Sequence, residues 1–289
     1  MGSRAGTNTT KTAMLMAALI GVLLVVGNAM GGYGGMLLWG GIGVIFNFGA
    51  WWFSDRLALA ANRAHPVTRE ELPEVYAIVE ELTQKAQIPM PRIYVIPSAS
   101  PNAFATGRGP EHAAVAVTQG ILGILNRRQL RAVLGHELAH VINRDTLIST
   151  IAAAVAGLVS AAGHMLRWGF LLGAGDRDSR RRGGGIGDLA LIIVAPFVAM
   201  LVQLAISRSR EYGADASGSA LSEDPEALAQ ALEALERGTV AQPYEFAGPA
   251  TAHLFIVNPF TGRALAGLFS THPPMADRIE RLRQMAQKY

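Results

Sequence analysis

The stretch RAVLGHELAHVINRD, from Arg131 to Asp145, carries two histidines four residues apart, with a glutamate directly after the first. Because a helix has 3.6 residues per turn, His136 and His140 are expected one above the other on one face. Two imidazoles so placed can both reach one tetrahedral Zn²⁺ ion at about 2.0–2.1 Å. Glu137 lies about 100° further round the helix, off the metal but close to a water bound there. The stretch therefore predicts an H-E-x-x-H metal site.

The segment before the motif carries a helix start. Asn126 can cap a helix, and Gln129 three residues later can bond back to it, so we expect a helix as far as Asn143. The alternative is a plain helix that exposes two histidines and one glutamate. A catalytic zinc site also needs a third protein ligand, which decides between the two.

The best candidate for that ligand is Glu211, in SRSREYGADA. It would complete a His₂Glu site with one position open for water. Asp215 follows one helical turn later on the same face, where it could accept the outer N–H of a ligating histidine and fix its tautomer. The alternative for both carboxylates is a solvated helix face.

Long apolar runs separate these polar segments. Half of the 289 residues are hydrophobic and 16% are charged, against roughly 25% in a typical soluble domain. Thr12–Ser54 contains 43 residues without Asp, Glu, Lys or Arg, which suits two membrane crossings of about 20 residues each. MGGYGG, Met30–Gly35, is the expected turn. A cleaved signal peptide over Thr12–Met30 is the competing interpretation, because Arg4 and Lys11 give it a basic start.

Two further spans are predicted at Thr146–Leu166 and Leu189–Ser207. The motif helix ends before the first, and Glu211 follows the second. Since two crossings return the chain to the same side, His140 and Glu211 can meet. Basic residues flanking the first hairpin place the polar segments in the cytoplasm, although the Arg-rich loop Asp176–Asp188 opposes that orientation for the second hairpin.

The predicted fold class is mainly α with a small β-sheet: four transmembrane helices in two hairpins and a cytoplasmic metalloprotease domain assembled from two chain segments. The N-terminal hairpin is expected over 1–54, and the first half of the protease domain, with the zinc-binding helix, over 55–145. The second hairpin is expected over 146–207, and the second half, with the third ligand, over 208–289.

Local patterns place four elements within the polar segments. Apolar spacing predicts a helix over Pro73–Ala86, with proline in its first turn. β-Branched residues predict a strand over Arg92–Ile96 and a second over Ala113–Leu122 that runs into a turn. Another helix is expected after Asp224 as N-cap, with Gly238 just past its end.

Three classes of activity are disfavoured. A formal net charge of +3 is too small and too scattered for nucleic acid. We find no Gly-x-x-x-x-Gly-Lys-Ser/Thr loop, so we expect no ATP chemistry. The absence of cysteine excludes a disulfide framework and a thiol nucleophile.

The spans and four motifs together resemble the HtpX family of membrane-bound zinc endopeptidases, related to the CAAX prenyl endopeptidases. The motifs are HELAH, PNAFATG (Pro101–Gly107), REYGADA (Arg210–Ala216) and THPPMADRI (Thr271–Ile279). The resemblance implies a gluzincin-type fold and one Zn²⁺ per chain, with Glu137 as general base. The zinc ligands that it implies are His136, His140 and Glu211.

The resemblance also implies a location and a role. We expect a multi-pass protein of a bacterial inner membrane with its active site on the cytoplasmic side. Its polypeptide substrates would be chiefly misfolded or damaged membrane proteins, as part of quality control and the stress response. Functional overlap with other membrane proteases is expected too.

Two of these motifs, PNAFATG and THPPMADRI, gain roles from the resemblance. Asn102 and Ala103 could pair with substrate backbone as an added strand, or belong to a plain surface loop. His272 could bind the metal in a resting state or steady an oxyanion alongside Arg278. Arg278 could instead be a surface charge on a helix.

The sequence thus favours a zinc-dependent endopeptidase in which a metal-bound water attacks the peptide carbonyl and Glu137 takes its proton. A catalytically weak membrane scaffold or chaperone-like protein that binds unfolded segments is the first alternative, and a zinc enzyme of another reaction class the second. An intramembrane protease is disfavoured by the charges around the motif helix. These charges are Arg127, Arg128, Arg131, Arg144 and Asp145.

Overall fold

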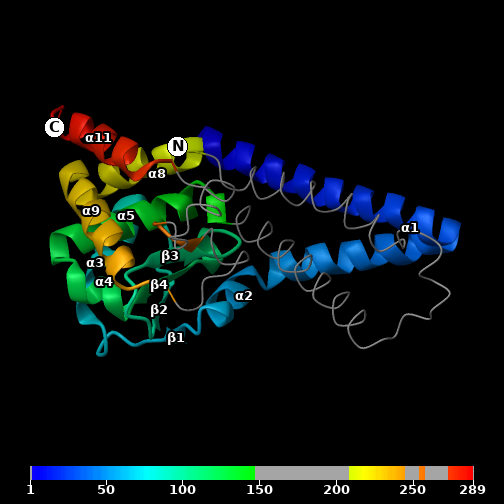
Figure 1. The fold of residues 1–289 in the computed structure, drawn as a ribbon, viewed down its shortest axis with the longest axis horizontal. Coiled ribbons are helices and arrows are strands. Elements are labelled where there is room, and N and C mark those ends of the chain that lie inside the picture. Colours follow the sequence, from blue (N-terminus) through cyan, green and yellow to red (C-terminus); the bar gives the residue numbers. More distant parts are fainter. Residues whose placement is uncertain (1, 147–207, 245–253, 258–272, 289) are drawn as a thin grey trace.

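The computed structural model describes residues 2–146, 208–244, 254–257 and 273–288 (Figure 1). Apart from Thr146, the two spans expected over 146–166 and 189–207 lie outside the described residues, as does the loop Asp176–Asp188. The described part is mostly helical, with one small sheet. Its helices are α1 Gly2–Trp52, α2 Ser54–Ala61, α3 Pro73–Ala86, η1 Pro110–His112, α4 Gln119–Ile124, α5 Arg127–Ile142, α8 Arg208–Ser222, α9 Pro225–Ala241 and α11 Met275–Ala286.

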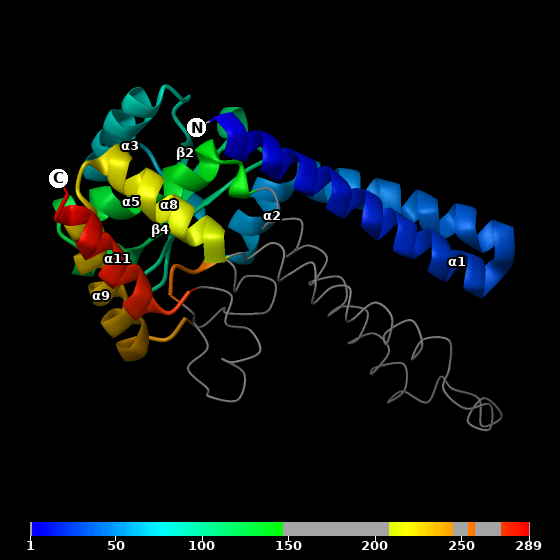
Figure 2. The same cartoon turned by 90° about the horizontal axis from the view of Figure 1, so that it is seen from above.

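The helix α1 is a hairpin of two antiparallel arms that projects away from the sheet (Figure 2). Its backbone leaves the helical conformation at Gly31 and Gly32, where φ of Gly32 is +55°, a value that glycine adopts without strain. The predicted turn is therefore confirmed. The stretches Gly6–Val25 and Gly31–Trp52 are long and apolar enough to cross a membrane.

The sheet has four strands in the order β1-β2-β4-β3. β2 and β4 are parallel, while β1 and β3 pair antiparallel at the two edges. The strand predicted at Arg92–Ile96 is confirmed. The strand predicted over Ala113–Leu122 ends earlier, at Thr118, because the Thr118 side chain accepts a hydrogen bond from the Ile121 N–H and α4 begins there. The strand bounds are β1 His65–Pro66, β2 Arg92–Ile96, β3 Ala103–Thr106 and β4 Ala114–Thr118.

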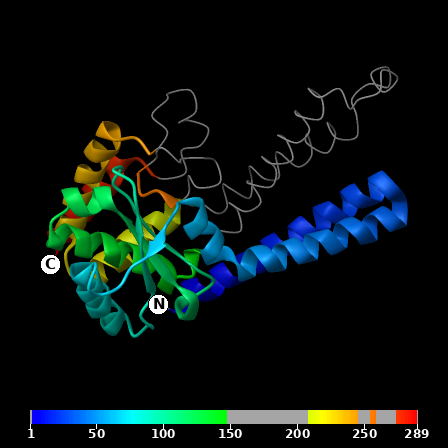
Figure 3. The same cartoon turned by 90° about the horizontal axis from the view of Figure 1, so that it is seen from below.

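The two faces of the sheet are buried by different parts of the chain (Figure 3). Alternate residues of β4 point to opposite faces. Val115 and Val117 join the larger core, which α3, α5 and α9 complete. Ala114 and Ala116 pack on the other side with residues of α2 and with Tyr244.

The larger core joins the two polar segments of the chain. Leu134 and Leu138 of α5 are completely buried there with Leu228 and Leu232 of α9 and Leu282 of α11. Burying such side chains contributes about 1.5–3 kcal/mol each. Residues on both sides of the second predicted hairpin therefore form one packed unit.

The helix α9 starts as predicted but ends later. The side chain of Asp224 accepts a hydrogen bond from the Ala227 N–H, which confirms the N-cap. The prediction that the helix stops before Gly238 is wrong, because α9 continues to Ala241. A Cβ atom at residue 238 would lie 2.7 Å from the Pro101 side chain, so this glycine allows close packing.

Candidate metal centre

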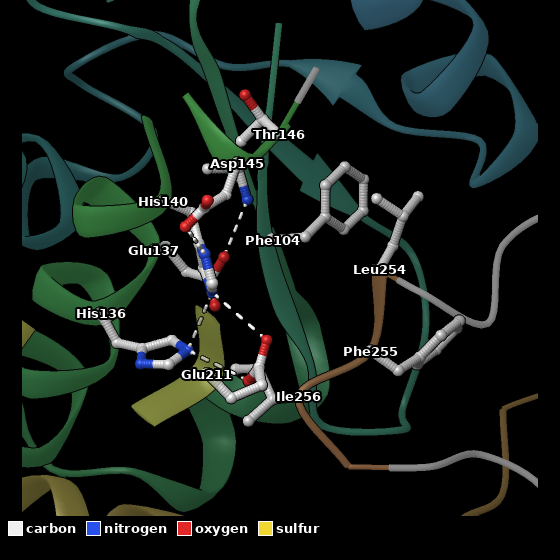
Figure 4. Close-up of a pocket in the computed structure, with 11 residues that line it drawn as sticks. Phe104, His136, Glu137, His140, Asp145, Thr146, Glu211, Leu254, Phe255 and Ile256 are labelled. Atoms are coloured by element: carbon white, nitrogen blue, oxygen red, sulfur yellow. Dashed lines mark hydrogen bonds and ion pairs between the residues drawn. The ribbon is translucent and has the colours of Figure 1, made fainter. Parts of the chain in front are cut away.

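The helix α5 presents the motif histidines side by side. Its capping box is confirmed: Asn126 accepts from the Gln129 N–H at 2.9 Å, and Gln129 accepts from the Asn126 N–H at 3.1 Å. The Nε2 atoms of His136 and His140 are 3.2 Å apart, and the two rings meet edge to face (Figure 4). Local helix geometry thus brings both nitrogens to one point.

Glu211, from the first turn of α8, faces those nitrogens. Its carboxylate oxygens lie 3.8 Å from Nε2 of His136 and 3.7 Å from Nε2 of His140. Within the described part of the chain these three residues form a group whose possible ligand atoms all lie within 4.8 Å of one another. Two nitrogens bound to one tetrahedral zinc at 2.0–2.1 Å would be about 3.3 Å apart, so the donor set fits such an ion.

Two glycines let α5 and α8 approach closely enough for this arrangement. A Cβ atom at Gly218 would lie 2.6 Å from the Cα atom of His136, and one at Gly135 would lie 3.0 Å from the Gly218 carbonyl oxygen. Neither glycine belongs to the residues that the sequence motifs indicate for the site. The run of small residues in ADASGSA was the available signal, since small residues mark close helix contacts.

Glu137 is buried beside the cluster rather than within it. One of its carboxylate oxygens accepts a hydrogen bond from the Ala105 N–H of β3 at 3.0 Å. Burial raises the pKa of the Glu137 carboxyl, although the neighbouring imidazoles and this hydrogen bond oppose the rise. A carboxylate with a raised pKa accepts a proton more readily than one with an ordinary pKa.

Asp215 lies behind His136. Its Oδ1 atom is 3.0 Å from Nδ1 of His136, the ring nitrogen that faces away from Glu211. Burial opposes the charge of Asp215, but Arg278 and His136 outweigh it and lower the pKa of Asp215 to about 2. The carboxylate therefore stays ionised, in the place expected for a group that fixes the histidine tautomer.

Arg278 of α11 reaches the same cluster from the C-terminal end of the chain. Its side chain is fully buried, and its guanidinium donates two hydrogen bonds to Asp215, at 2.9 and 2.7 Å. It also lies 3.3 Å from a Glu211 oxygen. The alternative that Arg278 is a surface charge is therefore wrong, while His272 lies outside the described residues.

Asp145 engages the second histidine. Its Oδ2 atom is 3.2 Å from Nδ1 of His140. Burial disfavours the imidazolium, but the bond to Asp145 and the charge of Glu211 outweigh it and raise the pKa of His140 to about 9. A metal ion that binds His140 therefore competes with a proton for the imidazole. The sequence indicates Asp145 only as one of the charges around the motif helix; its place five residues after His140 was the available signal.

Asn102 is engaged by the protein's own chain. It is buried, its backbone N–H and C=O bond to Thr118, and its side-chain amide donates to Leu254 O and accepts from the Ile256 N–H. The expectation that Asn102 pairs with substrate backbone is thus corrected, since these groups are occupied. Asn102 instead fixes the segment 254–257.

Ala103 and the rest of β3 lie at the sheet edge. Because the pair 102–118 is hydrogen-bonded, the N–H and C=O groups of Ala103 and Ala105 point away from β4. The alternative of a plain surface loop is wrong, because this segment is a strand of the sheet.

A pocket lies at the cluster. It is lined by motif residues that include Glu137, by Phe104 and Ala105 of β3, and by Leu254, Phe255 and Ile256 of the segment that Asn102 holds.

Comparison with known proteins identifies the family. The sequence profile described as peptidase family M48 matches residues 69–286, which contain the whole cluster. The chain belongs to peptidase family M48. As a family M48 member it is a metalloendopeptidase that acts on polypeptides, and the resemblance to the HtpX family is confirmed by its relatives.

The relatives match over almost the full length. A "Protease HtpX homolog" of Syntrophobacter fumaroxidans is 51% identical over 287 residues, which are 99% of this chain and 100% of that protein. A protein of the same name from Pyrococcus furiosus is 51% identical over 279 residues, 96% of each chain. Among solved structures, S. mikatae Ste24p matches with a TM-score of 0.51 at 16% identity, over 95% of this family M48 chain and 64% of the Ste24p chain. That match shows a shared fold.

Proposed function

We propose that this metalloendopeptidase is a zinc enzyme of a bacterial inner membrane that hydrolyses misfolded or damaged membrane proteins. One observation carries the proposal. Three side chains with the right donor atoms, His136, His140 and Glu211, meet in a pocket that also contains the buried carboxylate of Glu137. The pocket borders the edge strand β3, where an extended peptide can be held.

We assign the three clustered residues as zinc ligands. A zinc ion bound there would lower the pKa of a coordinated water and polarise the carbonyl of the scissile bond. Glu137 would take a proton from a water in the pocket and return it to the leaving amine, which its raised pKa favours. Asp215 and Asp145 lie 3.0 and 3.2 Å from the outer nitrogens of the two histidines, a placement that would direct each Nε2 lone pair into the pocket.

Arg278 reaches this arrangement from α11, and its Nη2 atom lies 3.4 Å from Nε2 of His136. By pairing with Asp215 and Glu211 it neutralises part of the negative charge that the site gathers in a buried place. His272 keeps its proposed roles, to bind the metal in a resting state or to steady the oxyanion alongside Arg278.

The substrate would bind as an added strand at the edge of β3. Ala103 directs its N–H and C=O groups to that edge and Ala105 its C=O group, whereas the Ala105 N–H is occupied by Glu137. Main-chain pairing of this kind gives affinity with little dependence on side chains, which suits the cleavage of varied unfolded segments. The segment 254–257, fixed by Asn102, would form the facing wall.

The membrane assignment rests on the hairpin α1. Large apolar side chains on its arms face outward, for example Ile45, which is 75% exposed. Such an exposed apolar surface is typical of a membrane contact. We propose a second hairpin over 146–166 and 189–207, with the metal site at the cytoplasmic surface. Added protease in sealed vesicles of known orientation should cut at Asp176–Asp188 only from the side opposite the metal site.

A zinc-retention experiment tests the ligand assignment. The full-length chain in detergent should contain one zinc ion and cleave an unfolded model protein. Glu211→Ala should lose zinc to a chelator that leaves the wild type loaded, and should lose cleavage. Glu223→Ala, at an exposed carboxylate just beyond α8 that pairs with Lys85, should retain both. If Glu211→Ala holds zinc as tightly as the wild type, Glu211 is not a ligand.

A further inference from the structure

The start of the first apolar helix touches the end of the motif helix. Asn8 of α1 is only 7% exposed. Its Nδ2 atom donates to the Asn143 carbonyl at 2.9 Å and to Oδ1 of Asp145 at 2.6 Å. A side-chain amide has two hydrogens, so both bonds can form at once. In Figures 1 and 2 the N-terminus accordingly lies beside the compact part of the molecule.

Both acceptors lie at the end of the motif helix α5, and one of them contacts a motif histidine. Asn143 is the C-cap residue of α5, where helix carbonyls lack partners within the helix. Asp145 uses its other oxygen, Oδ2, to hold Nδ1 of His140 at 3.2 Å. A line of hydrogen bonds therefore runs from Asn8 through Asp145 to His140, whose Nε2 atom faces Glu211.

We propose that Asn8 is a positioning residue for the metal centre, and that the N-terminal hairpin completes the site as well as attaching it to a membrane. Asn8 fixes the rotamer of Asp145, and Asp145 fixes the ring of His140. The inference rests on the proposed function, in which His140 binds the metal. Asn8 lies outside residues 69–286, which the family profile matches, so that profile does not assign it.

The chemistry of the contact requires a neutral donor. Alanine at residue 8 removes one partner each from the Asn143 carbonyl and the Asp145 carboxylate. Aspartate has nearly the same shape but replaces the donor with a carboxylate, whose negative charge repels that of Asp145. The ring of His140 would lose its fixed orientation in both variants, and more so with aspartate.

The chain offers a matched control in the same hairpin. Asn47 is also buried, and its Nδ2 atom donates to the Met16 carbonyl at 3.1 Å, which joins the two arms of α1. Within the described residues, the side-chain hydrogen bond of Asn47 does not reach the metal cluster. Asn47→Ala therefore loosens the hairpin to a similar degree without acting on Asp145.

The test is metal release from full-length protein in detergent, loaded with Zn²⁺ and mixed with a chromogenic chelator. Changes in groups that hold a ligating histidine typically cost 10–100-fold in metal affinity. We expect Asn8→Ala and Asn8→Asp to release zinc on the order of 10-fold faster than wild type, and Asn47→Ala to release it at the wild-type rate. In Co²⁺-loaded protein, the visible absorption bands should shift in the Asn8 variants alone.

Zinc release at the wild-type rate in both Asn8 variants, or equal acceleration in Asn47→Ala, would overturn the inference. Parallel measurement of His140→Ala separates this failure from a failure of the proposed function. If His140→Ala retains zinc like the wild type, then His140 is not a ligand and the proposed function itself is contradicted. If His140→Ala loses zinc while the Asn8 variants do not, the inference alone is wrong.

Discussion

Gly218 of α8 lies directly against His136 of α5, so closely that a Cβ atom at residue 218 would come within 2.6 Å of the His136 Cα atom. Backbone atoms cannot give way as a flexible side chain can. The absence of a side chain at residue 218 therefore sets the separation of the two helices, and with it the 3.8 Å between Nε2 of His136 and Glu211.

Gly218→Ala should weaken zinc binding by at least about 10-fold, because the helices must separate and carry Glu211 away from the histidines. Alanine ordinarily stabilises a helix interior by about 1 kcal/mol relative to glycine, so the loss would not come from helix propensity. Gly123→Ala, in α4 with open space around residue 123, is the control and should bind zinc normally. Competition with a chelator measures both. Wild-type affinity in Gly218→Ala would show that this contact does not set the site.

Arg278→Ala should destabilise the protein strongly, by about 3–5 kcal/mol, because it leaves the buried charge of Asp215 unpaired. Arg283→Ala on the same helix removes an ion pair with Glu233 whose arginine is 48% exposed, and should cost about 1 kcal/mol or less. Denaturant unfolding in detergent compares the two. Equal losses would mean that the buried pair contributes no more than a surface pair.

Tyr244 should make the stability depend on pH in the alkaline range. Burial raises the pKa of its hydroxyl to about 12 from an ordinary value near 10. Between about pH 10 and pH 12 the unfolded state therefore binds fewer protons than the folded state, so stability falls as the pH rises. Tyr244→Phe should lessen this decline, whereas Tyr33→Phe, at an exposed tyrosine, should leave it unchanged. An identical decline in wild type and Tyr244→Phe would show that Tyr244 does not cause it.

The parts of the fold that depend on neighbouring residues could be predicted from the sequence. The capping box at Asn126, the strand Arg92–Ile96 and the glycine turn of α1 each have a local cause, and each is observed. Gly238 shows the limit of such patterns. A glycine near a helix end indicates a stop, but the same residue type also permits close packing, and only the neighbouring Pro101 decides between the two.

The contacts that organise the site join residues far apart in the sequence. Asn8 and Asp145 are separated by 137 residues, and Asn102 and Ile256 by 154. No local pattern predicts such pairs, because they depend on how whole helices and strands pack. The burial of Arg278 has the same origin: an arginine on an amphipathic helix is usually exposed, and only the carboxylates of α8 reveal its partner.

The proposed mechanism depends most on Glu137, and cleavage of an unfolded model protein by Glu137→Gln tests that role most directly. Glutamine keeps the shape of the side chain but cannot take a proton from water. With one zinc ion per chain verified in both samples, Glu137→Gln should be at least about 100-fold slower than the wild type, within the range that general-base catalysis contributes. Cleavage at the wild-type rate by the zinc-loaded variant would show that Glu137 is not the base.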